Sequence, residues 1–228
     1  MRGTGPPAGA LRGRRVLVTR RWPELMAGLA ADGAIAHEVP LVELRPPSEP
    51  GPLDEALRGL ARYRWLVFTS ANAVEAVAAR MTTLGVTLET GIRLASVGPA
   101  TTQAIDRVWP GTEVAIAPAT DFRGAGLVTA FQSEPLDGQR ILLPVSDRAA
   151  ETVERGLSVR GARVDRVIAY RTVATGGEGL GEHLRAGVDV AVFASPSAVE
   201  VFVSAAGENG RGVPAAVIGP TTAEAARA

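Results

Sequence analysis

Small polar residues follow the apolar runs of this chain at several places, where they could bind an anionic ligand. Serine, threonine or asparagine just before a helix caps it, and the N–H groups of the first helical turn attract anions. The candidates for this binding are Thr19, Arg20, Ser70, Ala71, Asn72, Gly98, Pro99, Thr101, Ser146, Arg148, Ser195, Ser197, Gly219, Thr221 and Thr222. Helix capping alone is the simpler interpretation for any one of them. Two of the sequence motifs that contain these residues, one around Ser70 and one around Gly98, occur again around Ser195 and Gly219. This duplication favours a shared binding role for the set.

Tyr170 is the residue best suited to donate a proton. It ends the apolar run VDRVIAY, directly before a Gly-rich connector. A phenol keeps its proton near neutral pH and can donate it in a hydrogen bond or a reaction. A packing role at the connector is the alternative. Structural or solvent-exposed roles are favoured for Tyr63, His37 and His183.

Composition excludes several kinds of active site. All 24 basic residues are arginine, and the chain has no lysine, no cysteine and two histidines. A Schiff-base lysine, a phosphate-loop lysine, a thiolate nucleophile and a cysteine-ligated zinc are therefore excluded. The 24 basic residues balance 24 acidic ones, so no overall basic field points to nucleic acid. Arginine itself suits carboxylates, and Arg20 and Arg148 each follow an expected strand directly.

The polar residues are expected at the ends of strands in an α/β fold. Short apolar runs, most of them rich in valine and isoleucine, alternate with alanine-rich stretches of helical spacing along the 228 residues. Such runs are typical of parallel strands that are buried on both faces, and their alternation with helices favours parallel sheets. In these sheets ligands bind beyond the carboxyl ends of the strands. The expected strands cover 16–19, 36–42, 65–70, 93–98, 113–117, 140–145, 164–170, 190–195 and 215–219.

The chain contains an internal repeat. WLVFTSANAVEAV (65–77) resembles VAVFASPSAVEVF (190–202), and SVGPATTQAI (96–105) resembles AVIGPTTAEA (216–225). We therefore expect two similar α/β lobes that face each other across a cleft. In the first half a further strand, EVAIAP, follows the second motif, whereas the second half stops at Ala228, so the chain is expected to end one strand early.

Two connectors allow two ways of building the lobes. The Pro-rich segment 43–52 and the Gly-rich segment 172–179 both indicate linkers, at equivalent places in the two halves. Either each half folds by itself, or each lobe combines pieces of both halves. No stretch approaches the roughly 20 apolar residues of a membrane span, and the opening residues lack a secretory pattern, so we expect a cytoplasmic protein without membrane partners.

Six short motifs follow one another along the chain: VLVTR, FTSANAV, VGPATT, VIAYRT, FASPSAVEVF and IGPTT. Their order and spacing resemble those of the uroporphyrinogen-III synthase family (HemD type), and the resemblance extends from about Arg14 to Thr222. The resemblance implies two flavodoxin-like lobes, each a mostly parallel sheet flanked by helices, with a two-strand hinge and a cleft between them. One lobe would combine 13–42 with 173–228, and the other would cover 46–169. Residues 43–45 and 170–172 would form the hinge.

The resemblance also implies a function. Members of the family are hydro-lyases of tetrapyrrole biosynthesis. They close the linear octacarboxylate hydroxymethylbilane to uroporphyrinogen III with inversion of ring D. They use neither a metal nor an organic cofactor. Tyr170 would then be catalytic, the strand-end residues above would bind substrate, and the protein would act as a monomer without nucleic acid. A ligand-sensing domain of a transcriptional regulator and a two-lobed binding protein are the alternatives.

Overall fold

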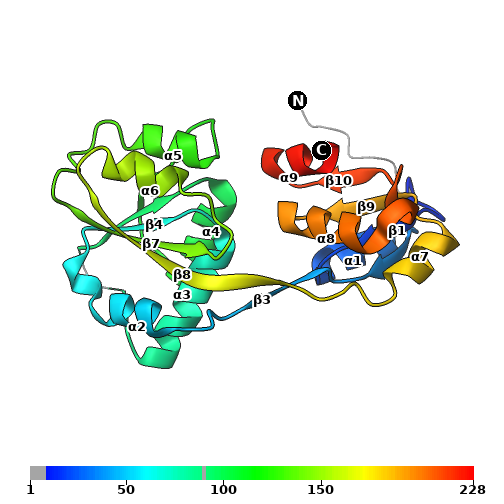
Figure 1. Ribbon diagram of the computed structural model, residues 1–228, viewed down its shortest axis with the longest axis horizontal. Helices are drawn as coiled ribbons and strands as arrows, with labels where there is room; N and C mark the ends of the chain where they lie inside the picture. Colours follow the sequence, from blue (N-terminus) through cyan, green and yellow to red (C-terminus); the bar gives the residue numbers. More distant parts are fainter. Residues whose placement is uncertain (1–8, 89–90) are drawn as a thin grey trace. The chain divides into compact units, whose positions relative to one another are not determined.

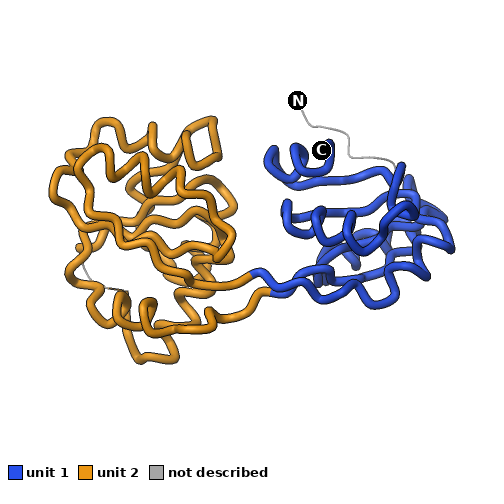
Figure 2. The backbone as a smooth tube through the Cα atoms, in the orientation of Figure 1, with its two compact units in different colours: residues 1–43, 172–228 blue, residues 44–171 orange. Residues whose placement is uncertain are grey.

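The computed structural model describes residues 9–88 and 91–228 of the chain. They form an α/β fold with two compact units, shown in Figures 1 and 2: unit 1 is 1–43 with 172–228, and unit 2 is 44–171. The chain therefore passes twice between the units. Among the described residues, no helix has the length and apolar character that crossing a membrane requires.

Unit 2 is built around a six-stranded sheet. Its strand order is β3-β8-β7-β4-β5-β6, and every pair from β8 to β6 is parallel. The strands are β3 (Val42–Arg45), β4 (Trp65–Phe68), β5 (Arg93–Ser96), β6 (Val114–Ile116), β7 (Arg140–Ser146) and β8 (Arg163–Ala174). The helices are α2 (Gly51–Arg58), η1 (Leu60–Arg62), α3 (Ala71–Leu84), α4 (Pro99–Val108), α5 (Gly124–Ala130) and α6 (Thr152–Ser158).

Helices cover both faces of this sheet, which explains why its strands are continuously apolar. All four residues of β4 are buried, and they alternate between the two faces. Leu66 and Phe68 pack in one core cluster with α2, α3 and α4. Trp65 and Val67 pack in a second cluster with α5 and α6.

Unit 1 repeats the central part of this plan with a four-stranded parallel sheet of order β10-β9-β1-β2. Its strands are β1 (Arg15–Val18), β2 (Ile35–Glu38), β9 (Val190–Phe193) and β10 (Ala215–Val217). Its helices are α1 (Pro23–Ala31), α7 (Leu180–Ala186), α8 (Pro196–Ala206), η2 (Gly207–Gly210) and α9 (Pro220–Arg227). Side chains of α7 and α8 pack on one face and Leu29 of α1 on the other. The expectation of two mostly parallel sheets flanked by helices is confirmed.

Two sequence expectations about element boundaries were wrong. A single strand was expected over 36–42, but the structure has β2 and β3, separated at Pro40, which has no N–H to donate to a sheet. The irregular part of the Pro-rich connector is only 46–50, because β3 precedes it and α2 begins at Gly51, with Pro52 in its first turn.

The Gly-rich connector also begins later than expected. β8 continues through Thr172 and Val173 to Ala174, and both residues are β-branched, which favours strand. The residues expected as hinge segments, 43–45 and 170–172, therefore lie in β3 and β8, which are neighbouring strands of one sheet.

Candidate functional site

The candidate binding residues lie at the carboxyl ends of parallel strands in both units. In unit 2 they follow β4, β5 and β7, and in unit 1 they follow β1, β9 and β10. Since parallel strands end at the same edge of a sheet, each unit gathers its candidates at one edge, where α/β proteins bind ligands. Tyr170 of β8 belongs to the same edge in unit 2, because it pairs with Ser146 at the end of β7.

Ser70 and Ser195 cap equivalent helices in the two units. Ser70 Oγ accepts a hydrogen bond of 3.1 Å from the N–H of Ala73 in α3. Ser195 Oγ accepts one of 3.3 Å from Ala198 in α8, and it lies 3.0 Å from Ser197 Oγ. Ser70 thus satisfies one of the first N–H groups of α3, and those of Ala71 and Asn72 also belong to this first turn, where an anion is favoured.

Gly98 and Gly219 begin the other pair of equivalent helices, each followed by a proline in the first turn. A Cβ at Gly98 would lie 3.1 Å from the side chain of Phe122, so a larger residue there requires that side chain to shift slightly. Gly219 has φ +87°, a conformation that other residues rarely adopt. Glycine therefore sets the backbone at the start of α9, while Pro99 reduces the number of N–H groups available in α4.

Several candidate hydroxyls are turned into the protein. Thr101 and Thr222 are 4% and 2% exposed, so their side chains pack inside their units. Thr19 is fully buried, and its Oγ1 donates to the carbonyl of Val192 at 2.7 Å, which ties β1 to β9. Thr19 therefore stabilises the end of β1, and Thr221 is the exposed threonine of the set.

The two candidate arginines lie on the surface. Arg20 is exposed, with its guanidinium carbon 5.6 Å from the centre of the Trp22 ring. Arg148 is exposed in the turn after β7, where its N–H donates to Ser146 Oγ at 3.2 Å. The hydroxyl of Ser146 donates in turn to Asp147 at 3.0 Å. Ser146 therefore holds the turn that carries Arg148.

Tyr170 combines a buried ring with a hydroxyl at the sheet edge. The residue is 8% exposed, and its ring belongs to the core cluster of α2, α3 and α4. Its Oη lies 3.2 Å from Ser70 Oγ. The structure thus brings together the candidate proton donor and one candidate binding residue, which are 100 positions apart in the sequence.

A β-bulge aims Tyr170 at this position. Val145 of β7 pairs with Ile168, but the next residue, Ser146, pairs with Tyr170, so Ala169 is an extra residue in β8. Ala169 and Tyr170 consequently pack in the same core cluster, although consecutive residues of a regular strand face opposite sides. Bulges often redirect a side chain beside an active site in this way.

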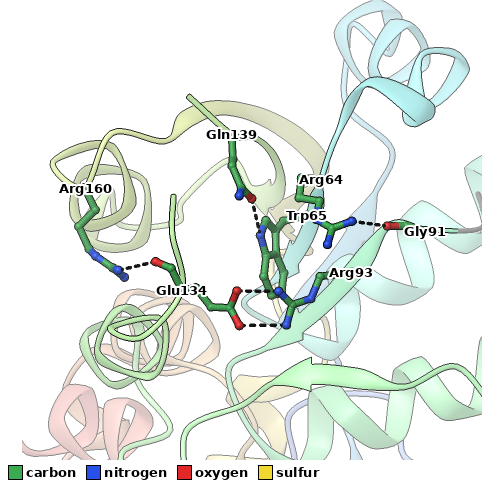
Figure 3. Close-up of polar contacts among 7 residues, drawn as sticks. All are labelled: Arg64, Trp65, Gly91, Arg93, Glu134, Gln139 and Arg160. Atoms are coloured by element: carbon green, nitrogen blue, oxygen red, sulfur yellow. Dashed lines mark hydrogen bonds and ion pairs between the residues drawn. The ribbon is translucent and has the colours of Figure 1, made fainter. Parts of the chain in front are cut away.

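A charged cluster that the sequence did not indicate lies at the opposite, amino-terminal edge of the unit 2 sheet (Figure 3). Arg93 makes two hydrogen bonds to Glu134, of 2.6 and 2.9 Å, and its guanidinium lies 4.1 Å from the centre of the Trp65 ring. Arg160 donates to the carbonyl of Glu134 at 2.9 Å. The hydrogen bonds from Arg93 lower the pKa of Glu134. Sequence periodicity carries no sign of such a cluster, because its members come from separate elements.

A second polar network lies near the same edge. Tyr63 Oη donates to Asp165 at 2.7 Å, and Arg140 donates to the same carboxylate oxygen at 2.7 Å. Burial and the bond to Asp165 raise the pKa of Tyr63. Burial opposes ionisation of Asp165, but the bonds from Tyr63 and Arg140 together lower its pKa. Apart from the ion pair of Asp54 and Arg80, the groups of unit 2 with a shifted pKa thus lie away from the candidate site.

Metal-binding clusters were not expected, and the described part of the chain holds no group of three or more His, Cys, Asp or Glu side chains suited to a metal ion. What the carboxyl edges offer instead is backbone N–H groups, hydroxyls, two surface arginines and one phenol. These groups can bind carboxylates by hydrogen bonds and can transfer a single proton.

Known proteins with related sequences share one description. A family model described as Uroporphyrinogen-III synthase HemD matches residues 23–228. The uroporphyrinogen-III synthase of Synechococcus elongatus is 36% identical over 167 residues, which cover 71% of this chain and 62% of that protein. A putative uroporphyrinogen-III synthase of Methanothermobacter thermautotrophicus is 28% identical over 211 residues, which cover 87% of this chain and 81% of that protein. The alignment with the Synechococcus protein thus spans less than two thirds of its length.

A solved structure has a similar fold. The crystal structure of a mutant uroporphyrinogen III synthase from the extremely thermophilic bacterium Thermus thermophilus superposes with a TM-score of 0.68 at 21% identity. The superposition covers 94% of this chain and 88% of the Thermus chain. At this identity the likeness concerns the fold alone, and it extends over both units of the present chain.

Proposed function

Because the chain belongs to the uroporphyrinogen-III synthase HemD family, we propose that it closes hydroxymethylbilane to uroporphyrinogen III. The reaction is a cyclisation with loss of water and inversion of ring D. The observation that carries this proposal is the family match, which extends from Pro23 to the last residue, Ala228, and so includes both units.

The chemistry of the carboxyl edges supports this proposal. Hydroxymethylbilane carries eight carboxylates, and these bind at the first turns of α3 in unit 2 and α8 in unit 1, with Arg20 and Arg148 as charged partners. Helix N-termini and guanidinium groups both favour carboxylates. Most of the binding groups are backbone N–H groups at helix starts, and Ser70 and Ser195 hold two of these starts by their cap hydrogen bonds.

Positioning is the main requirement of this reaction. The substrate can lose its hydroxyl and cyclise unaided to the isomer in which ring D is not inverted. The enzyme must therefore bring the substituted α-carbon of ring D to the reacting carbon of ring A first. Orientation alone can lower a barrier by about 7–11 kcal/mol in favourable cases. A hundredfold preference for one ring closure needs only about 2.8 kcal/mol.

Tyr170 supplies the proton that the departing hydroxyl needs. As the bond from the ring A methylene carbon to oxygen breaks, the phenol donates its proton and the hydroxyl leaves as water. The remaining azafulvene cation is attacked by ring D, and a spiro intermediate then opens and recloses with ring D inverted. A proton released from the substrate at the end returns to Tyr170, so that water is the only by-product. The hydroxyl of Tyr170 supports this role because it lies at the carboxyl edge, beside Ser70.

Product analysis tests the proposal. Freshly prepared hydroxymethylbilane is incubated with and without the protein, and the oxidised porphyrin products are separated by isomer. The proposal predicts mainly type III product with the protein and type I product without it. Type I product alone in both incubations would overturn the proposed function.

The assembly state is part of the same proposal. We propose that the protein acts as a monomer, since its two units already contain the full set of candidate residues. Light scattering during active turnover should give the mass of one chain, 23.6 kDa. A larger mass that persists on dilution would contradict this. Localisation in the cytoplasm stays a prediction from the sequence.

A further inference from the structure

The hydroxyls of Ser70 and Tyr170 form a pair within unit 2. Their oxygens lie 3.2 Å apart, within hydrogen-bond distance, and either could donate to the other. Ser70 follows β4 at the N-terminus of α3, and Tyr170 lies in β8. The pair therefore joins two segments that meet only through the folded sheet.

The hydrogens and lone pairs of the two oxygens allow the bond in which Ser70 is the donor. A serine hydroxyl has one hydrogen and two lone pairs. Ser70 Oγ already accepts the N–H of Ala73 at 3.1 Å, which uses one lone pair and leaves its hydrogen free. If Ser70 donates this hydrogen to Tyr170 Oη, the phenol keeps its own hydrogen for another acceptor. In the opposite direction the hydrogen of the phenol would be engaged with Ser70.

We infer that Ser70 is a positioning residue for Tyr170, which donates to the phenol oxygen and leaves the phenolic proton directed at the departing hydroxyl of the substrate. This inference rests on the proposed function. When Tyr170 gives up its proton, negative charge develops on Oη. A hydrogen bond to a charged oxygen is stronger than one to a neutral oxygen, so the bond from Ser70 strengthens as the proton leaves.

The equivalent serine of unit 1 shows that capping does not require this bond. Ser195 caps α8 as Ser70 caps α3, but its hydroxyl lies 3.0 Å from Ser197 Oγ. The second contact of Ser70 is thus a particular feature of unit 2. The β-bulge at Ala169, which turns Tyr170 toward the core face, completes the arrangement.

A double-mutant cycle tests the inference. The variants are Ser70→Gly, Tyr170→Phe and the two combined, with Ser70→Thr as the conservative variant. Glycine is chosen because it is a good N-cap, whereas alanine is a poor one, so α3 should stay intact while the hydroxyl is lost. Circular dichroism and thermal unfolding check that each variant is folded.

The expected results separate positioning from a merely structural role. Ser70→Gly should lower kcat about 3- to 10-fold, the range of one hydrogen bond, with KM changed less than about twofold. Ser70→Thr should stay within about twofold of the wild type. In the Tyr170→Phe background, which lacks the phenol oxygen, Ser70→Gly should change kcat less than about twofold, because the two residues act through one bond.

Three results would overturn the inference. One is a Ser70→Gly variant with wild-type kcat, the second is an equal loss of kcat from Ser70→Gly with and without the phenol, and the third is a Tyr170→Phe variant with wild-type kcat. The proposed function is judged separately, from the isomer that the wild type makes. If the wild type forms type III product and the cycle is additive, only the positioning role fails.

Discussion

The proposed proton transfer depends on the phenol of Tyr170. Its ring is buried in the core cluster of unit 2, and its hydroxyl lies 3.2 Å from Ser70. The buried ring fixes the position of the hydroxyl oxygen, because a packed aromatic side chain has little rotational freedom, and the contact with Ser70 bears on the direction of its proton. Removal of the hydroxyl alone should therefore change the chemistry and leave the packing as it is.

Tyr170→Phe should lower kcat about 100-fold, the lower limit of what a general acid contributes, while the substrate that the variant itself converts still closes to type III. Isomer selectivity persists because it depends on how the carboxylates are held. Initial rates and product separation on the same samples measure both effects.

Tyr63→Phe is the matched control, since the chain has only two tyrosines. Tyr63 donates to Asp165 near the amino-terminal edge, so its loss should cost about 1 kcal/mol of stability with turnover unchanged. Equal rates for Tyr170→Phe and Tyr63→Phe would contradict the role given to Tyr170.

The rings of His37 and His183 face each other in unit 1 at a tilt of 30°, with their centres 4.2 Å apart. Burial of His37, then repulsion by His183 and Arg15, lowers the pKa of His37 below its usual 6.5. The unfolded chain therefore binds a proton at His37 more readily than the folded chain does. Unit 1 should be most stable above about pH 6.5, and this contribution should be lost as the pH falls toward and below the lowered pKa.

Hydrogen exchange of β1 and β2 between pH 5 and 8, corrected for intrinsic rates, measures this effect. Protection should fall on acidification in the wild type and fall less in His37→Gln. Identical acid profiles for the two proteins would show that His37 does not carry the pH dependence.

Residue types and spacing could predict which serines cap helices, but not every side-chain orientation. Ser70 and Ser195 each stand before a helical stretch, and both accept a cap hydrogen bond. Thr101 and Thr222 stand in equally suggestive motifs, yet their side chains are buried. Whether a hydroxyl near a strand end faces solvent depends on the tertiary packing around it, which local spacing does not encode.

At the scale of elements, α5 owes its close packing to a glycine. A side chain at Gly126 would overlap the backbone oxygen of Asp121, which comes just before the helix. Gly126→Ala should therefore destabilise the protein by about 1–3 kcal/mol, the usual cost of overpacking. Urea unfolding followed by circular dichroism measures the change.

Gly28→Ala provides the opposite case in α1. No atom lies within 4 Å of a side chain added at Gly28, and the residue is exposed within the helix. Alanine there should stabilise the protein by about 0.5–1 kcal/mol, because glycine is the poorer helix former. If Gly126→Ala stabilised the protein as Gly28→Ala should, the packing described for α5 would be wrong.

The strands show where sequence patterns stop being informative. Continuous apolar runs predicted the central strands, because burial on both faces leaves a clear pattern. The bulge at Ala169 left no such pattern, since VIAY is a good strand sequence with or without an extra residue. The continuation of β8 to Ala174 depends on β3 as its neighbour, and β3 lies far earlier in the sequence, before the whole of the unit 2 core.

At the scale of the whole molecule, the internal repeat indicated two related sheets. The order β8-β7-β4-β5 in unit 2 corresponds to β2-β1-β9-β10 in unit 1. The matching motifs FTSANAV and FASPSAV follow β4 and β9, so equivalent helices begin at the same edge of each sheet. The charged cluster around Arg93 and Glu134 has no such repeated motif, which is why it could not be predicted.

Two α/β units that present N–H groups, hydroxyls and arginines at their strand ends suit a reaction governed by orientation. We propose above all that this chain holds hydroxymethylbilane so that ring D closes in the inverted sense. Spontaneous closure competes with it at every enzyme concentration. The outcome must therefore depend on how much of the substrate the protein captures before it reacts unaided.

The most direct test is the type III fraction of the product at increasing protein concentration, with a fixed amount of freshly made substrate. The fraction should rise with protein concentration and approach complete type III product once capture outpaces spontaneous closure. A fraction that stays at the level of the protein-free reaction, while the substrate is consumed at the protein-free rate, would contradict the account.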